Sequence, residues 1–185
     1  MNTYEQIVAE IKAAKNIVIT SHKSADGDSV GSSLGLLNFI EKLGKTATVC
    51  HPDAAPKFLH WLDTSAFLLM TDQPTEITTA FKTADLVFCL DYNSTSRIGP
   101  DMQELLEAVT CKIVMIDHHL NPEDFSTITV SETLASSTSE LIVELIEQSG
   151  NGDLLDQKVG IPLYLGILTD TGSFRFPSTQ PRTHE

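Results

Sequence analysis

The sequence has few cysteines and no long apolar run. Its 185 residues contain three cysteines, Cys50, Cys89 and Cys111, each in or beside an apolar segment. An odd number of scattered cysteines is typical of buried thiols in a reducing compartment rather than of a disulfide framework. No segment approaches the roughly 20 consecutive apolar residues that span a bilayer, and the first residues lack the features of a signal peptide. We therefore expect a cytoplasmic protein with no membrane partner.

Positive charge is also scarce. Twelve Lys and Arg residues stand against twenty-five Asp and Glu residues, which gives a formal net charge of −13. Proteins that bind long nucleic acid neutralise its phosphates with Lys and Arg, so this balance argues against a long duplex as partner. A small phosphorylated ligand remains compatible with it, provided that divalent cations reverse the sign of the field locally.

Three common catalytic or nucleotide-binding motifs are missing from the sequence. There is no G-x-x-x-x-G-K-[ST] loop, which excludes a P-loop enzyme. No G-x-G-x-x-G follows a predicted strand, which argues against a dinucleotide cofactor. There is also no G-x-S-x-G nucleophile elbow. The chemistry must therefore come from other residues.

The order of apolar runs predicts an α/β domain with a mainly parallel β-sheet flanked by helices. Strands are predicted at 16–20, 46–50, 85–90 and 112–116, and helices at 3–14, 31–43, 101–109, 136–148 and 156–169. Prolines interrupt residues 52–83, for which we expect short helices and loops, and residues 120–134 are expected to form a loop or an edge strand. Strands that alternate with helices form βαβ units. The ligand crevice of such a sheet lies beyond the carboxyl ends of its strands.

Acidic residues and histidines follow four of these apolar segments. They are His22, Asp26 and Asp28 after 16–20, Asp91 after 86–90, Asp117-His118-His119 after 112–116, and Asp170 after 163–169. The first three groups fall at the carboxyl edge of the predicted sheet, whereas Asp170 follows a helix and must join them by tertiary packing. Each group alone is compatible with an ordinary turn or a helix cap. Together they predict a metal site.

The candidate ligands are carboxylates with a minority of imidazoles and no thiolate. This set suits Mn²⁺ or Mg²⁺, with Co²⁺ as a further substitute, better than structural zinc. It is large enough for two ions. Two ions about 3.5–4 Å apart clamp a phosphoryl group and generate a nucleophile at neutral pH.

Several other residues have competing interpretations. Arg97 is a candidate to bind a substrate phosphate, although pairing with a neighbouring carboxylate is slightly favoured for it. Arg175 is the better phosphate candidate, because it follows the Asp170 motif directly. The run Ser136-Ser137-Thr138 is interpreted mainly as a helix cap, with a ligand role as the alternative. The remaining residues are interpreted as structural or exposed (His51, His60 and His184) or as ordinary packing (Phe58, Trp61 and Leu62).

Four ordered motifs extend through nearly the whole chain. They are His22-x3-Asp26-Gly27-Asp28, Asp91, Asp117-His118-His119 and the run 166–174 around Asp170. In this combination the sequence resembles the DHH phosphoesterase superfamily. The segments 96–99, 135–140 and 174–176 are most similar to its branch of bifunctional oligoribonucleases (nano-RNases) and pAp phosphatases, the NrnA-like proteins.

The resemblance implies a role for each motif residue. His22 and Asp26 would hold one manganese ion, Asp28, His118 and Asp170 the other, and Asp91 would bridge them. His119 would contact the scissile phosphate, and Asp117 would orient the histidines, as carboxylates beside ligating imidazoles commonly do. Catalysis is thus expected from Asp91, Asp117 and His119 together with two metal ions that activate a water molecule.

The resemblance also implies a function. We expect hydrolysis of short 5′-phosphorylated oligoribonucleotides and of 3′-phosphoadenosine 5′-phosphate (pAp). The alternatives are an inorganic pyrophosphatase or exopolyphosphatase, a cyclic-dinucleotide phosphodiesterase, and a metal-binding module that is inactive without a second domain. We further expect residues 1–185 to be a single catalytic domain from a longer two-domain protein whose C-terminal substrate-binding domain is absent here. Homodimerisation is left open.

Overall fold

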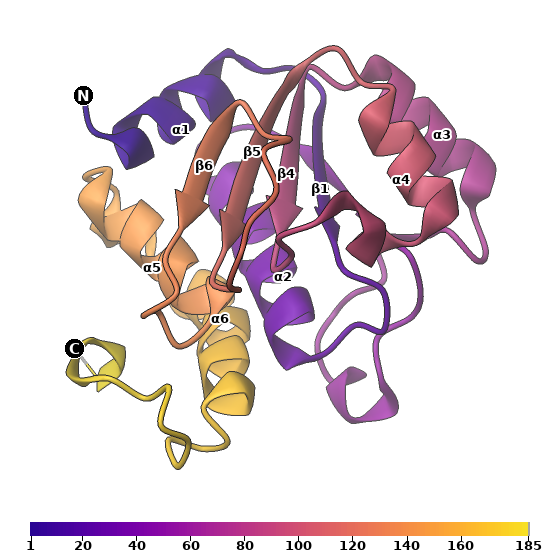
Figure 1. The fold of residues 1–185 in the computed structure, drawn as a ribbon. Helices are drawn as coiled ribbons and strands as arrows, with labels where there is room; N and C mark the ends of the chain where they lie inside the picture. The colour runs from indigo at the N-terminus through magenta and orange to yellow at the C-terminus, as the bar shows by residue number, and fades with distance from the viewer. Residues whose placement is uncertain (185) are drawn as a thin grey trace.

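A computed structural model describes residues 1–184 and has a parallel β-sheet at its centre. Within these residues six strands pair in the order β3-β2-β1-β4-β5-β6, and every pair is parallel. The strands are β1 (Ile17–Ser21), β2 (Ala47–His51), β3 (Leu68–Leu69), β4 (Leu86–Leu90), β5 (Lys112–Asp117) and β6 (Ile128–Ser131). Figure 1 shows β1, β4, β5 and β6 side by side with their arrowheads at one edge. The predicted α/β class is confirmed.

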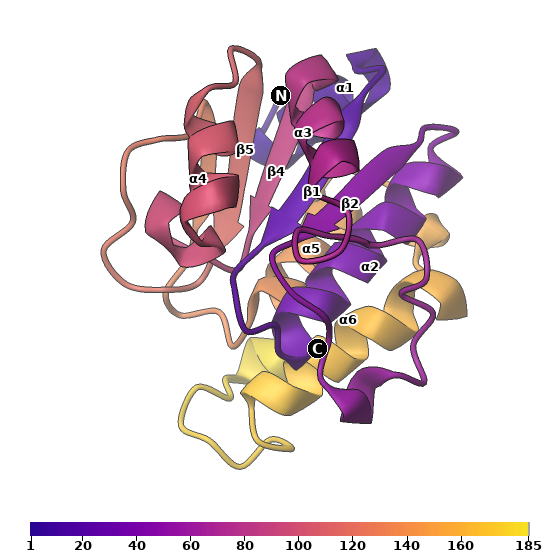
Figure 2. The ribbon, with the colours of Figure 1, turned by 90° about the vertical axis from the view of Figure 1, so that its right-hand side faces the viewer.

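Helices cover both faces of the sheet. They are α1 (Thr3–Ala13), α2 (Gly27–Lys42), α3 (Pro74–Thr83), α4 (Pro100–Glu107), α5 (Thr138–Gln148) and α6 (Gln157–Asp170), with short 3₁₀ turns at 57–59, 95–98, 152–154 and 181–184. Helices α1, α2, α5 and α6 share one buried apolar cluster, and α3 and α4 share the other. Figure 2 shows the two sets on opposite sides of the sheet. Burial on both faces explains why every residue of β1 and β4 is buried and why β4 is apolar throughout.

The predicted start of α2 is wrong, and residues 52–83 contain the unpredicted strand β3 in addition to the expected short helices. Helix α2 begins at Gly27 and not at Gly31, because Asp26 is its N-cap and accepts hydrogen bonds from the backbone N–H groups of Asp28 and Ser29. The Asp-Gly-Asp segment therefore opens the helix and is not a separate turn. Residues 52–83 contain the ten-residue helix α3, in which Pro74 occupies the first turn. Proline is tolerated there because the first N–H groups of a helix have no partner within it.

The packing predicted around Trp61 is also wrong in part. Leu62 is buried, but the side chains of Trp61 and Phe58 are 61% and 62% exposed. Cys50 and Cys89 are buried free thiols, and Cys111 is partly buried. Residues 128–131 form the predicted edge strand as β6. Among residues 1–184, none of the helices combines the length and the apolar character needed to cross a membrane.

Candidate metal centre

The sheet changes its winding direction between β1 and β4. The chain leaves β1 through α2 toward β2 on one side, and leaves β4 through α4 toward β5 on the other. Because these two connections run to opposite faces, a crevice opens beyond the carboxyl ends of β1 and β4. His22 directly follows β1 and Asp91 directly follows β4. Both side chains therefore lie at the position where a doubly wound sheet binds its ligand.

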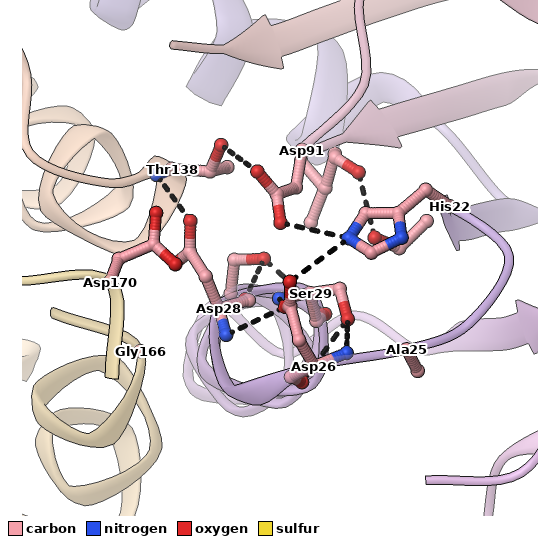
Figure 3. Close-up of polar contacts among 12 residues, drawn as sticks. His22, Ala25, Asp26, Asp28, Ser29, Asp91, Thr138, Gly166 and Asp170 are labelled. Atoms are coloured by element: carbon pink, nitrogen blue, oxygen red, sulfur yellow. Dashed lines mark hydrogen bonds and ion pairs between the residues drawn. The ribbon is translucent and has the colours of Figure 1, made fainter. Parts of the chain in front are cut away.

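The first group of candidate ligands comes from β1, β4 and the start of α2. The Nε2 atom of His22 lies 3.3 Å from Oδ2 of Asp91 and 3.5 Å from Oδ2 of Asp26. Figure 3 shows the imidazole between these two carboxylates. The Nδ1 atom of His22 lies 2.8 Å from the carbonyl oxygen of Lys23 and donates to it. That bond turns Nε2 toward the carboxylates.

The second group combines α2, β5 and α6. The Nε2 atom of His118 lies 3.3 Å from Oδ2 of Asp170, 3.5 Å from Oδ1 of Asp91 and 4.0 Å from Oδ2 of Asp28. Asp170 ends α6, and Asp28 lies in the first turn of α2. Helix packing thus brings Asp170 to the sheet edge. Asp170 and Asp28 lie 142 residues apart in the sequence.

Close packing of α2 against α6 makes this approach possible. A Cβ atom at Gly31 would lie 2.4 Å from the carbonyl oxygen of Pro162, and one at Gly166 would lie 2.0 Å from Oγ of Ser139. Neither position has room for a side chain. The two glycines therefore allow the helices that carry Asp28 and Asp170 to come together.

Asp91 belongs to both groups. Its side chain is almost completely buried, one oxygen faces His22 and the other faces His118. The backbone of Asp91 adopts a φ of 64°, a left-handed conformation that aspartate tolerates better than most residues with a side chain. This conformation aims the carboxylate out of β4 and into the crevice.

Asp117 holds His119. The Nδ1 atom of His119 lies 2.7 Å from Oδ1 of Asp117, and the backbone N–H of His119 donates to Oδ2 at 2.9 Å. Because a carboxylate accepts hydrogen bonds, Nδ1 carries the proton. The Nδ1 atom also lies 3.8 Å from Oδ1 of Asp91. Among the described residues the Asp117 carboxylate makes no hydrogen bond or ion pair with the His118 ring, so it orients one histidine of the pair and not both.

Charge is distributed unevenly across the first group. Burial opposes the charged form of His22, but its contacts with Asp26 and Asp91 outweigh this and raise the pKa of His22 to about 10. Burial likewise favours neutral carboxyls at Asp26 and Asp91, but the nearby imidazoles hold the pKa of each below its usual value. The imidazole therefore carries the positive charge that these carboxylates require.

In the second group the carboxyl pKa values of Asp28 and Asp170 are raised and not lowered. Contacts with Asp91 and Asp28 overcome the effect of burial and raise the pKa of His118 to about 9. Burial and the charge of Asp91 raise the pKa of Asp170 to about 6. Burial and the charges of Asp91 and Asp170 raise the pKa of Asp28 well above its usual value. Such a site gains free energy from a bound cation.

The donor set fits divalent metal ions. Three groups of side chains each offer ligand atoms within 4.8 Å of one another: His22, Asp26 and Asp91; Asp28, His118 and Asp170; and Asp91, His118 and His119. Carboxylate oxygens with imidazole nitrogens and no sulfur suit Mn²⁺ or Mg²⁺. Asp91 is common to the first and third groups and contacts His118 of the second, so it can be shared by two ions.

Sequence reasoning missed the contribution of α5. Ser137 is the N-cap of this helix, as predicted, but Thr138 and Ser139 reach the candidate ligands. Their backbone N–H groups donate to the carboxylate of Asp28 at 2.7 and 2.9 Å, and the Thr138 hydroxyl donates to Oδ1 of Asp91 at 3.1 Å. Backbone donors leave no signal in residue types, although the Ser-Ser-Thr run marks the helix start that provides them.

The two predicted phosphate ligands lie outside these groups. Arg97 is exposed and, within residues 1–184, its side chain makes no ion pair, so the expected pairing with a neighbouring carboxylate is wrong. The Nε atom of Arg175 donates to the carbonyl oxygen of Gly172 at 2.7 Å. His51 is buried against Ser33, whereas His60 and His184 are exposed, as expected. Neither arginine is among the side chains that the structure groups as candidate metal ligands.

Comparison with known proteins identifies the family. The model of the DHH family N-terminal domain matches residues 16–167. The chain belongs to the DHH family. The predicted resemblance is thereby confirmed, and the matched residues include every candidate ligand except Asp170.

The DHH relatives include enzymes of several named activities. The bifunctional oligoribonuclease and PAP phosphatase NrnA of Thermus thermophilus is 31% identical over 180 residues, covering 95% of this chain and 50% of the relative. The cyclic-di-AMP phosphodiesterase GdpP of Geobacillus thermodenitrificans is 29% identical, covering 91% of this chain and 26% of the relative. The chain thus spans about half the length of the NrnA relative that it matches.

A solved structure matches nearly the whole chain. The crystal structure of an exopolyphosphatase-related protein from Bacteroides fragilis superposes with a TM-score of 0.95 at 37% sequence identity, covering 98% of this chain and 54% of the other. The DHH chain described here therefore shares the architecture of that protein over nearly its whole length.

Proposed function

We propose that this DHH chain is a single catalytic domain of a two-metal phosphoesterase that hydrolyses short 5′-phosphorylated oligoribonucleotides and pAp. The observation that carries the proposal is the position of Asp91 between His22 and His118, with 3.3 and 3.5 Å separating the contacting atoms. One carboxylate that faces two histidine–carboxylate groups is suited to bridge two ions. Mononuclear sites do not need such a residue.

The metal ions are proposed to be manganese. His22, Asp26 and Asp91 would hold one ion, and Asp28, His118, Asp170 and Asp91 the other. Two divalent ions supply activation of water at neutral pH and neutralise negative charge on a phosphoryl group. The excess of buried carboxylates around Asp91 supports this assignment, because such a cluster favours cation binding.

His119 is proposed to contact the scissile phosphate. Its side chain is about one-third exposed, whereas that of Asp117 is fully buried. The bond to Asp117 fixes Nδ1 and leaves Nε2 free to bind a phosphoryl oxygen. With a proton on Nε2 as well, the ring would donate to a phosphoryl oxygen and oppose charge that develops on the phosphate during hydrolysis. Arg97 and Arg175 are proposed to bind further phosphate oxygens of the substrate.

The substrate class follows from charge and from the relatives. A net charge of −13 disfavours long nucleic acid, because few cations are available to neutralise its phosphates. A ligand with one or two phosphates can instead be held by the metal ions. The similarity to NrnA favours oligoribonucleotides and pAp over other small phosphates. The relatives named as a cyclic-di-AMP phosphodiesterase and as an exopolyphosphatase-related protein keep cyclic dinucleotides, pyrophosphate and polyphosphate as alternatives.

The deciding experiment offers a panel of substrates to the chain in the presence of Mn²⁺. The panel contains pAp, a 5′-phosphorylated diribonucleotide, pyrophosphate and cyclic di-AMP, with release of phosphate and mononucleotides as the readout. Asp91→Asn serves as the inactive control, because asparagine also tolerates a positive φ but cannot bridge two cations as a carboxylate does. We expect turnover of the first two substrates by the parent and at least about a 1,000-fold loss in the variant.

Other results would redirect the proposal. Preferential cleavage of pyrophosphate or cyclic di-AMP would replace the substrate and retain the chemistry. Binding of Mn²⁺ without turnover of any substrate would favour a metal-binding module that does not catalyse by itself. Full activity in Asp91→Asn would refute the two-metal assignment.

A further inference from the structure

The first turn of α5 lies beside the candidate metal ligands and donates hydrogen bonds to Asp28 and Asp91. We propose that Thr138 is a positioning residue that fixes the distance between Asp91 and Asp28, and that this sets the affinity for the second metal ion. The inference rests on the proposed two-metal function and deepens it. It assigns a specific role to the hydroxyl group of Thr138.

Thr138 contacts both carboxylates directly. Its backbone N–H donates to Oδ2 of Asp28 at 2.7 Å, and its hydroxyl donates to Oδ1 of Asp91 at 3.1 Å. Figure 3 shows Thr138 beside both side chains. The same Oδ1 atom of Asp91 faces Nε2 of His118 at 3.5 Å. One residue therefore holds the shared carboxylate and a carboxylate of the second group at a fixed separation.

Thr138 supports the two carboxylates in the ionised form that metal binding requires. Both are buried, with exposed fractions of 0% for Asp28 and 2% for Asp91, and like charges in a region of low dielectric repel strongly. A donor to each of them offsets this repulsion, because hydrogen bonds to carboxylates are stronger than neutral ones. The N-terminus of α5 adds its positive end dipole at the same place.

The helix does not need this hydroxyl for its own stability. Ser137 already caps α5 by accepting a hydrogen bond from the backbone N–H of Glu140 at 3.1 Å. The hydroxyl of Thr138 bonds to Asp91, which is 47 residues away in the sequence, and not to its own helix. Valine would preserve the shape and the backbone N–H while removing only the hydroxyl donor.

The neighbouring contacts keep Thr138 itself in place. Glu140 accepts hydrogen bonds from both the backbone N–H and the hydroxyl of Ser136, at 3.0 and 2.5 Å. Arg182 contacts the other oxygen of Glu140 at 2.5 Å. The turn that precedes Thr138 is therefore anchored on one side by its own helix and on the other by the segment 181–184. A rigid support of this kind is what a positioning residue requires.

The test compares Thr138→Val and Thr138→Ser with the parent chain. The readouts are the stoichiometry and affinity of Mn²⁺ binding, the electron paramagnetic resonance signal of a spin-coupled Mn²⁺ pair, and the melting temperature of the metal-free chain. Thr78→Val is a matched control, because Thr78 also lies in a helix but bonds only to Pro74 of its own turn. Loss of an outer hydrogen-bond partner typically weakens metal affinity about 10–100-fold.

We expect Thr138→Val to weaken binding of the second ion by about 10-fold or more and to reduce the spin-coupled signal. Thr138→Ser should restore both to within about threefold of the parent, since it retains the hydroxyl, and Thr78→Val should match the parent. The inference is overturned if Thr138→Val binds two coupled ions with parental affinity. If the parent chain itself does not bind two Mn²⁺ ions, the proposed two-metal function fails as well. Failure of the Thr138 role alone is therefore distinguishable from failure of the proposed function.

Discussion

Asp117 binds His119 through both of its carboxylate oxygens, one to the ring at 2.7 Å and one to the backbone N–H at 2.9 Å. The two contacts fix the position of the side chain and the identity of the protonated ring nitrogen. A histidine held in this way presents the same nitrogen to every ligand. The pair therefore provides a sensitive test of the proposed phosphate contact.

Asp117→Asn should lower turnover with little effect on metal binding. The amide keeps the size of the side chain but removes its negative charge, and its N–H₂ group can reverse the direction of the hydrogen bond to Nδ1. We expect kcat to fall about 100-fold while two Mn²⁺ ions still bind. The measurement is kcat and KM on pAp with parallel calorimetric titration of Mn²⁺. Asp153→Asn, at an exposed carboxylate, is the control, and equal activity in both variants would contradict the role of Asp117.

Gly166→Ala should destabilise the chain and distort the metal centre. The added methyl group would lie 2.0 Å from Oγ of Ser139 and 2.8 Å from Oδ1 of Asp28, so α5 or α6 would have to move. Overpacking of this kind costs about 1–3 kcal/mol of unfolding free energy. Gly160→Ala, on the same helix, meets no atom within 4 Å and should instead stabilise α6 by about 0.5–1 kcal/mol. Urea denaturation of both variants measures the difference, and equal effects would refute close packing at Gly166.

His51 should make the stability of the metal-free chain depend on pH. Burial and the positive charge of His22 lower the pKa of His51 to about 4, whereas an unfolded histidine titrates near 6.5. The unfolded state therefore binds the extra proton first, and stability should fall as the pH drops from about 6.5 toward 4. By pH 5 the loss from this group is about 2 kcal/mol. Unfolding free energies at pH 7 and pH 5 measure it, and His51→Gln should flatten the slope. An unchanged slope would exclude His51 as the source.

Arg182→Met should destabilise the chain through Glu140. Glu140 is buried, with 5% of its surface exposed, and Arg182 contacts it at 2.5 Å and Glu144 at 2.7 Å. Removal of the cation leaves a buried carboxylate with hydrogen-bond donors but without its charged partner, which costs about 1–2 kcal/mol. Lys158→Met, which removes an exposed ion pair to Glu41, should have a clearly smaller effect. Thermal melting of both variants decides the matter, and a larger effect at Lys158 would contradict the expectation.

The strand ends of this chain could be predicted because apolar β-branched runs stop abruptly at polar residues. His22, Asp91 and Asp117 each follow such a run, and a parallel sheet places the ends of its strands at one edge. The same reasoning could not place Asp170, because helix packing and not strand pairing brings it to the site. The closeness of α2 and α6 depends on Gly31 and Gly166. In the sequence these glycines indicate only a low helix propensity and not a close helix contact.

Other features were missed because their signals are ambiguous. The Asp26-Gly27-Asp28 segment has the composition of a turn and also of a helix start, and only the capping bonds of Asp26 distinguish the two. The N–H groups of Thr138 and Ser139 are present in every residue except proline, so residue types could not reveal that they bind Asp28. Trp61 was expected to be packed because aromatic residues usually are, but tertiary structure leaves it exposed.

The candidate ligands are spread from residue 22 to residue 170, and they come from β1, β4, β5 and both α2 and α6. Two metal ions bound at this edge would thus cross-link segments that meet only after the sheet and the helices packed on it have assembled. Contacts completed late in folding slow unfolding more than they accelerate folding. Bound metal should therefore mainly slow unfolding. Chelation of the metal should shorten the lifetime of the folded chain and leave its refolding rate nearly unchanged.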